Sequence, residues 1–402
     1  MKPLVLETSG VPAKLWVRDL NQVEGLAMEQ IKRMATVPGM FKWLAIMPDV
    51  HVGKGAVVGS VAANKEMVVP NIVGVDIGCG GCAADTGLVW EPKRMGKEFW
   101  RSWQGLVMRE VPLGFGRLKE KADWEGFEVR MTAGKLQQLV KEVAPLQLGS
   151  LGGGNHFIEG CREEGTGRVW LTVHSGSRHT GLQIAMHHAG VAAKLDERKG
   201  WKGLPDLGYL PLDSEEGRDY VTDMNWAIDF ALENRFRMME VMLAAFERVC
   251  GRQGVRWSWT SGREGIINIH HNFANGEKHY GAEVMVHRKG ATQARQGQLG
   301  VVPGSMGAAT YIVQGLGNPE SFESCAHGAG RTMSRTQAKK RWKQEDLQEQ
   351  LTGTFTKASR GIIDEAPGAY KNIDEVMDLQ SDLVAVKHKL MPIMTVKGEG
   401  RN

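Results

Sequence analysis

The sequence predicts an α+β fold, with helices and strands mixed along the chain. Three observations lead to this fold class. Short β-like runs precede clusters of glycine, apolar residues elsewhere recur every three or four positions, and no internal repeat or Pro/Ser-rich linker divides the chain. Chemistry-bearing side chains follow the β-like runs, in the loops that a rigid scaffold usually positions. We therefore expect one large domain over residues 1–402, with its functional groups gathered at the centre.

Helical periodicity is clearest after Thr222, a candidate N-cap. The apolar residues of this stripe are Met224, Ile228, Leu232, Phe236, Met239, Leu243 and Phe246. Weaker helical patterns cover residues 23–35, 135–143 and 182–195, and another begins at Ser334. The β-like runs cover residues 44–47, 67–75, 169–173, 266–269, 283–286 and 309–313.

Composition bounds the function without naming it. Of 402 residues, 42% are hydrophobic and 24% are charged, as in a globular protein with a full core. No apolar run reaches the ~18 residues of a membrane span, and MKPLVLETSG does not read as a secretion signal. Five cysteines without an export signal favour thiols or metal ligands over disulfides. We expect a cytoplasmic protein that does not contact a membrane.

Carboxylate, thiol and imidazole side chains follow several β-like runs. The run ending at Val75 leads into Asp76 and Cys79, the run ending at Val173 leads into His174, and His156 lies in GGGNHFIE. His270 and His271 follow another run and would point to opposite faces of a strand, so at most one should bind a metal. This mixed set of O, S and N donors suits Mn, Fe, Co or Zn.

The Cys79-Gly80-Gly81-Cys82 sequence has a second interpretation. A C-x-x-C pair is found in redox dithiols and in half of a zinc knuckle. The other cysteines are too dispersed to supply a second pair, and two glycines are a poor helix start for a thioredoxin-like motif. This reading stays open as the weaker alternative.

Glycine, at 51 residues, is concentrated in loops that suit phosphate. The P-loop, the G-x-G-x-x-G dinucleotide fingerprint, the G-x-S-x-G elbow, H-E-x-x-H and the K-x-D-G ligase motif are all absent. Glycine loops at 149–154, 303–307 and 327–331 remain, and His327 stands directly beside the last. An imidazole nitrogen there can attack phosphorus and form a covalent phosphoramidate. The basic stretch from Arg331 to Lys343, with Trp342 within it, suits a phosphodiester backbone.

These strings occur together in one known family. In order they are MPDVHVGKG, GVDIGCG, GNHFIE, HSGSR, HHN, HRKGA, PGSMG, SCAHGAGRTMSR and VKG. The chain resembles the RtcB family of RNA-splicing ligases along nearly its whole length. The resemblance implies a single RtcB-like domain with a central metal and nucleotide cleft.

The resemblance also implies cofactors and roles. His327 would be the nucleophile that takes GMP from GTP, and Asp49 would orient it. Two Mn²⁺ ions would be held by Asp76, Cys79, His156, His174 and His271, with Cys79 bridging. The guanylate would contact Asn155, His156, Phe157, Ile158, Glu159, His271, Asn272, Pro303, Gly304, Ser305, Met306, Thr310, His327, Gly328, Ala329, Gly330, Arg331 and Lys397. Arg178 and Arg288 would touch RNA phosphates.

The expected substrates are RNA ends with a 3′-phosphate or 2′,3′-cyclic phosphate and a 5′-hydroxyl. Their joining would pass through a histidine–GMP intermediate and an activated RNA-3′-pp-5′-G end, in RNA repair or tRNA splicing. The family resemblance leaves room for a protein activator. Two alternatives are kept: a metal-dependent RNA-end phosphoesterase that does not ligate, and a CGGC redox or metal-binding protein.

Overall fold

The computed structural model describes residues 2–199 and 206–399, and its strands form two large sheets. The six-stranded sheet has the order β1-β2-β3-β4-β12-β11, and all neighbours are antiparallel except β2 and β3. Its strands are β1 (Leu4–Leu6), β2 (Ala13–Leu15), β3 (Met40–His51), β4 (Val58–Asn64), β12 (Ala282–Lys289) and β11 (Asn272–His279). Asn272 pairs with Lys289 where β11 meets β12.

The seven-stranded sheet is wholly antiparallel, in the order β10-β6-β8-β7-β17-β15-β14. Its strands are β10 (Ile266–His270), β6 (Gly80–Val89), β8 (Arg168–Ser175), β7 (Phe157–Glu163), β17 (Val384–Val396), β15 (Thr310–Gly315) and β14 (Leu299–Pro303). The sheet curls, so that β14 at one edge contacts β6 and β10 at the other. Gly81 permits this approach, because a Cβ there would lie 2.9 Å from Cβ of Val301.

The backbone passes from the seven-stranded sheet to the six-stranded sheet at His271, the single residue between β10 and β11. Two short pairs complete the strands: β13 (Ala291–Gln293) with β16 (Ser324–Ala326), and β5 (Met67–Val68) with β9 (Leu210–Pro211). β16 ends immediately before His327. The junction of the sheets therefore gathers the ends of several strands in one place.

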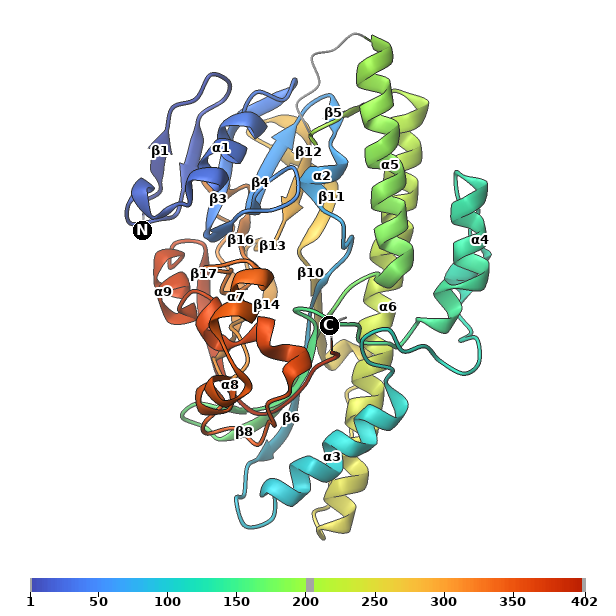
Figure 1. The fold of residues 1–402 in the computed structure, drawn as a ribbon, viewed down its shortest axis with the longest axis vertical. Coiled ribbons are helices and arrows are strands. Elements are labelled where there is room, and N and C mark those ends of the chain that lie inside the picture. The colour runs from blue at the N-terminus through green and yellow to red at the C-terminus, as the bar shows by residue number, and fades with distance from the viewer. Residues whose placement is uncertain (1, 200–205, 400–402) are drawn as a thin grey trace.

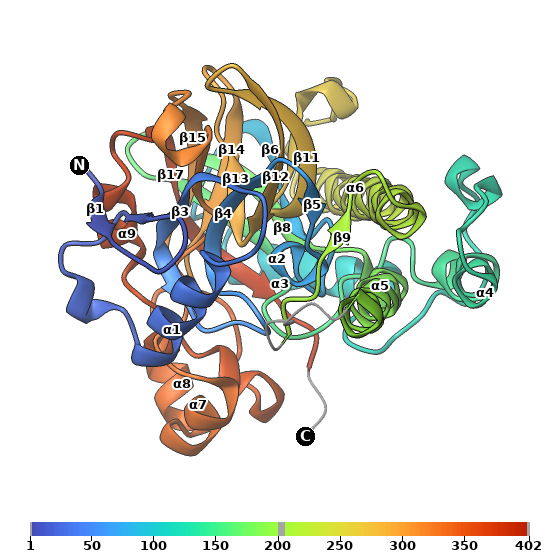
Figure 2. The same ribbon diagram turned by 90° about the horizontal axis from the view of Figure 1, so that it is seen from above.

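Two long antiparallel helices, α5 (Arg178–Lys199) and α6 (Glu215–Arg252), run along one side of the molecule (Figure 1). Figure 2 shows α4 (Gly134–Glu142) lying outside this pair, and α7 (Arg335–Arg341) and α8 (Gln344–Gln350) on another side of the sheets. The remaining helices are α1 (Gly25–Met34), α2 (Pro70–Val73), α3 (Lys97–Glu110) and α9 (Ile373–Leu379). Short 3₁₀ turns cover Leu20–Gln22, Glu125–Glu128, Ala144–Leu146, Arg263–Gly265, Pro319–Ser321, Arg360–Glu365 and Pro367–Ala369.

The core is divided among the layers. Trp100 and Trp103 of α3 pack with Phe246 of α6 against the seven-stranded sheet, and all three are fully buried. A second cluster fills the space beneath the six-stranded sheet, where Phe322 and Trp16 are fully buried. This packing holds α6 against the strand ends that meet at His271.

The predicted α+β class is confirmed, and single-domain organisation over residues 1–402 stays a prediction. Two element predictions were wrong. The long helix begins after Ser214, whose Oγ accepts the amide of Gly217 at 3.0 Å, whereas Thr222 lies inside the helix. The strand predicted over residues 67–75 covers only Met67–Val68, because Pro70 has no amide for a β-ladder and begins α2 instead.

No helix within residues 2–199 and 206–399 combines the length and apolar character needed to cross a membrane.

Candidate active site

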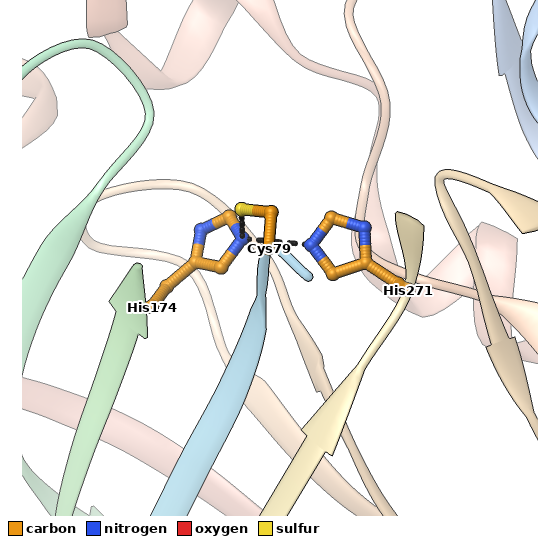
Figure 3. A group of neighbouring side chains, drawn as sticks. All are labelled: Cys79, His174 and His271. Carbon is orange, nitrogen blue, oxygen red and sulfur yellow. Dashed lines mark hydrogen bonds between the residues drawn. The ribbon is translucent and has the colours of Figure 1, made fainter. Parts of the chain in front are cut away.

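Five predicted metal ligands come together at the junction of the sheets. Asp76 and Cys79 lie in the turn between α2 and β6, His156 precedes β7, His174 lies near the end of β8, and His271 joins β10 to β11. Figure 3 shows the Cys79 thiol and the rings of His174 and His271 converging on one point. The three donor atoms lie close together, as do those of Asp76, Cys79 and His156. Cys79 belongs to both groups, as a bridging ligand would.

The distances describe two overlapping sites. Cys79 Sγ lies 3.4 Å from Nε2 of His156 and 3.4 Å from Nε2 of His174. Nε2 of His174 is 3.0 Å from Nε2 of His271. Nε2 of His156 is 2.9 Å from a carboxylate oxygen of Asp76. Donor atoms this close, from four different segments, are arranged to share cations.

Backbone carbonyls fix the tautomers of two ligands. Nδ1 of His156 lies 3.0 Å from the carbonyl oxygen of Leu151, and Nδ1 of His174 lies 3.2 Å from that of Asn155. A carbonyl only accepts, so each Nδ1 carries the proton in the neutral ring and each Nε2 has a lone pair facing the cluster. This orientation by an outer carbonyl is typical of metal-bound histidine. The donor set therefore fits divalent cations.

Burial sets the charge of the cluster without a cation. It lowers the pKa of His174 and His271 well below the usual value and raises the pKa of the Cys79 thiol. Burial alone would raise the pKa of Asp76, but the hydrogen bond and charge of His156 lower it overall. The rings thus stay neutral and able to bind a metal, while Cys79 needs a bound cation to become a thiolate.

His327 lies beside the cluster, next to His271. Its Nδ1 lies 2.6 Å from Oδ2 of Asp49, which also accepts the His327 amide at 3.2 Å. Asp49 is fully buried, and the ammonium of Lys371 donates to the carbonyls of Pro48 and Val50 on either side of it. The His327 ring centroid lies 4.6 Å from that of His271. The ring is therefore held with Nδ1 protonated and Nε2 free to act as a nucleophile.

Gly290 leaves the room that this ring occupies. Its φ is +59°, and a Cβ there would lie 3.0 Å from Cε1 of His327 and 2.2 Å from Cγ1 of Val58. A larger residue would therefore clash with Val58 and crowd the His327 ring.

A cavity of about 350 Å³ opens over His327 and the cluster. Among the predicted nucleotide and metal residues, its walls contain Asp76, Cys79, Asn155, Phe157, His174, His271, Asn272, Pro303, Gly304, Ser305, Met306, His327, Gly328, Ala329, Gly330, Arg331 and Lys397. His156 lies behind this wall, in contact with Asp76 and Cys79. Residues of the glycine loops 303–307 and 327–331 line this cavity with His327, whereas none of the loop 149–154 does.

Besides His156, three predicted nucleotide contacts do not line the cavity. Ile158 is fully buried in the core beneath α3, because it is paired between Val173 and Val396. Glu159 turns to the other side of β7, where Thr395 donates a 2.8 Å hydrogen bond to it and burial raises its pKa to about 7. Thr310 is buried in β15, paired with Pro303.

The two arginines predicted to touch RNA lie in different places. Arg178 begins α5 beside the cluster and contacts Nδ1 of His156 at 3.4 Å. Arg288 is fully buried, and its guanidinium binds Glu277 at 2.5 and 3.2 Å. The prediction that Arg288 touches RNA was therefore wrong. Neighbouring residues of a strand face opposite sides, so Lys289 lines the cavity instead.

Several cavity residues were missed from the sequence. They are His51, Lys54, Lys289, Glu365 and Tyr370. His51 and Lys54 stand within MPDVHVGKG and Lys289 within HRKGA, so the motifs contained a signal for these three. Glu365 and Tyr370 belong to no motif that we distinguished.

Glu365 forms ion pairs with three basic side chains in the wall of the cavity. It pairs with Arg335 at 2.7 Å, Lys397 at 3.2 Å and Arg331 at 3.3 Å. Burial would raise its pKa, but these cations lower it to about 2. Asp364 also pairs with Arg335, at 3.0 Å. Two carboxylates against three cations leave this part of the cavity with a net positive charge, which suits a phosphate-bearing ligand.

Cys82 does not belong to the site. It is fully buried in the apolar cluster that contains Trp100. Cys79 lies three positions earlier, and in extended chain this odd spacing points the two side chains to opposite sides. All five cysteines are free and buried. The geometry thus gives no support to a Cys79–Cys82 redox pair.

Comparison with known proteins identifies the chain as a ligase. The model of the family described as "tRNA-splicing ligase RtcB" matches residues 30–398. RNA-splicing ligase RtcB of Escherichia coli K12 is 41% identical over 414 residues, covering 98% of this chain and 99% of that protein. tRNA-splicing ligase RtcB of Thermococcus kodakarensis is 31% identical, covering 96% and 95%. The chain belongs to the RtcB family of RNA-splicing ligases.

Proposed function

We propose that this chain joins RNA ends, using GTP as the nucleotide co-substrate. The observation that carries the proposal is the orientation of His327: Asp49 holds the proton on Nδ1, so Nε2 faces a cavity that also contains the metal-capable cluster. The names of the relatives, RNA-splicing and tRNA-splicing ligases, support RNA as the substrate.

His327 performs the first step. Its Nε2 attacks the α-phosphorus of GTP, forming a P–N bond as the bond to the bridging oxygen breaks and pyrophosphate leaves. The ring becomes positively charged, and the Asp49 carboxylate at 2.6 Å stabilises that charge. Asp49 is thus a positioning residue that also balances the nucleophile's new charge.

The cluster would hold two divalent cations, for which we propose Mn²⁺. Cys79, His174 and His271 would bind one, and Asp76, Cys79 and His156 the other. When bound, such cations act as Lewis acids and neutralise phosphate charge. The cavity's basic side chains, including Arg331 and Arg335, would hold the remaining phosphate oxygens.

RNA completes the reaction. A 3′-phosphate, or one derived from a 2′,3′-cyclic phosphate, takes GMP from His327 to give an RNA-3′-pp-5′-G end, and the P–N bond breaks. A 5′-hydroxyl then attacks, and GMP leaves. Arg178 beside the cluster and the exposed Lys339 and Lys340 of α7 would contact RNA phosphates. A protein activator and a cytoplasmic location stay predictions.

Covalent labelling tests the proposal directly. The protein is incubated with Mn²⁺ and GTP labelled at the α-phosphate, denatured, and mapped by mass spectrometry. We expect an acid-labile label on His327. A metal-dependent phosphoesterase would hydrolyse the RNA end without acquiring a label, so absence of label together with loss of the terminal phosphate would establish that alternative instead.

A further inference from the structure

Two neighbouring residues of α6, Asn234 and Arg235, reach the ligand-bearing segments from behind. Both side chains are fully buried. Arg235 donates from Nη1 to the carbonyl of Gly78 at 2.7 Å and to that of Ser175 at 2.9 Å. Its Nε donates to Oδ1 of Asn268 at 2.6 Å. One guanidinium therefore joins three segments of the chain that are far apart in sequence.

Each of these contacts lies next to a metal-ligand position. Gly78 precedes Cys79, Ser175 follows His174, and Asn268 lies in β10, three residues before His271. The segments that carry the three ligands of the first site are thus all hydrogen-bonded to one planar group. Because a guanidinium is rigid, it fixes the relative positions of all three acceptors.

Asn234 does the same for the second site. Its Oδ1 accepts the amides of Gly149 and Ser150 at 2.7 and 3.0 Å. Its Nδ2 donates to the carbonyl of Ser150 at 3.1 Å and to that of Gly176 at 3.2 Å. This loop leads directly to Leu151, whose carbonyl orients His156.

The neighbourhood of Arg235 shows that this charge does not serve an ordinary ion pair. In the part of the chain that the structure describes, no carboxylate forms a salt bridge with it, and its Nη2 has no hydrogen-bond partner. Glu233, on the same helix, pairs with Arg237 and Arg263 instead. A buried cation without a carboxylate partner is costly to folding. An apolar side chain would fill the space at lower cost but would leave the ligand segments unconnected.

We propose that Asn234 and Arg235 are the positioning residues of the metal centre: from α6 they set the spacing of the segments carrying Cys79, His156, His174 and His271. This inference rests on the metal centre of the proposed function. Outer groups of this kind typically change metal affinity by about 10–100-fold when removed.

The test uses Co²⁺ as a spectroscopic probe of the metal-free full-length protein. Arg235→Lys keeps the positive charge but cannot span three acceptors. We expect Co²⁺ to bind about 10–100-fold more weakly, with an altered thiolate-to-cobalt absorption band. Asn234→Leu has similar volume and no change in charge, and we expect weaker Co²⁺ binding with the thiolate band retained. Thermal unfolding of each metal-free variant separates this effect from loss of fold.

Arg237→Lys is the matched control. Arg237 lies on the same helix and bonds Glu233 and the carbonyl of Asp123, away from the ligands, so Co²⁺ affinity should not change. Folded Arg235→Lys with wild-type affinity and spectrum would overturn the inference. If Arg235→Lys does not fold, Asn234→Leu decides, and wild-type Co²⁺ affinity in that folded variant would overturn the inference. Failure of the wild-type protein itself to bind Co²⁺ would instead refute the metal centre.

Discussion

Oδ2 of Asp49 accepts the Nδ1 proton of His327 at 2.6 Å, and this one bond leaves Nε2 as the unprotonated nitrogen of the neutral ring. Without it, the neutral ring could carry its proton on Nε2, where it would block attack on phosphorus. The bond joins β3 of the six-stranded sheet to the loop after β16. The reactivity that we propose for His327 therefore depends on a residue that lies 278 positions away in the sequence.

Asp49→Asn should slow labelling by GTP by a factor on the order of 10²–10⁴, because the amide can stabilise the wrong tautomer and cannot balance the ring's charge. His327→Ala should abolish labelling, while Mn²⁺ binding is retained in both variants. Rates of label incorporation and Mn²⁺ titration by electron paramagnetic resonance measure the two effects. Label on His327→Ala would place the nucleophile elsewhere.

Cys79 and Asp76 should differ in how many cations they affect. Cys79 belongs to both ligand groups and Asp76 to one. We expect Cys79→Ser to weaken both Mn²⁺ sites, and Asp76→Ala to reduce the stoichiometry from two ions toward one, with all reaction stages lost in either case. Metal content after dialysis and binding isotherms distinguish these patterns. Full occupancy in either variant would mean that the ligand set is wrong.

Arg288 should stabilise the fold without contacting RNA. Replacing it with Met leaves Glu277 buried without its main partner, which should lower the free energy of unfolding by about 3–5 kcal/mol. The double variant Arg288→Met/Glu277→Gln should lose less than the two single changes together. Urea unfolding gives these energies, and filter binding gives RNA affinity. A selective loss of RNA affinity at unchanged stability would restore a role in RNA binding.

A feature of this structure could be predicted from the sequence where it depends on neighbouring residues, and could not where it depends on strand pairing between distant segments. The convergence of Cys79, His156, His174 and His271 was predictable because each stands at the end of a strand or beside one, within an unusual motif. The choice between Arg288 and Lys289 was not, because it depends on which side of β12 faces the cavity. That orientation is set by pairing with β4 and β11, which are distant in sequence.

The wrong predictions of secondary structure have the same origin. Thr222 resembles an N-cap, but it lies within α6, where its hydroxyl donates to the carbonyl of Arg218. The helix begins earlier, after Ser214, because buried Tyr220 extends its apolar face in that direction. The strand β6 was not predicted from the sequence, because its first two residues are glycines, which have low β-propensity. They are required there, since a Cβ at Gly80 would lie 2.1 Å from the carbonyl oxygen of Ile269.

Cys82 provides a test of the redox alternative. Its side chain lies in the core, and burial raises the pKa of its thiol to about 12, so it should neither form a disulfide with Cys79 nor bind metal. Cys82→Ala should lower the free energy of unfolding by about 0.5–3 kcal/mol and leave labelling and metal content unchanged. Thiol titration before and after mild oxidation checks the first point. Loss of labelling in a stably folded Cys82→Ala protein would favour the redox reading.

The metal-free protein should lose stability as the pH falls from 6.5 to 4, and His287 should contribute to that loss. Its Nδ1 donates to the carbonyl of Ala62 and its Nε2 accepts the amide of Val69, so the folded protein requires the neutral ring. Burial accordingly lowers the pKa of His287 to about 4. Between pH 4 and 6.5 the unfolded chain binds the proton and the folded chain does not, so protonation favours unfolding. At about 1.4 kcal/mol per pKa unit, this histidine should account for about 2 kcal/mol between pH 7 and pH 5. Urea unfolding at both pH values measures the difference, and His287→Gln should reduce it by that amount; an equal pH dependence in the variant would contradict the assignment.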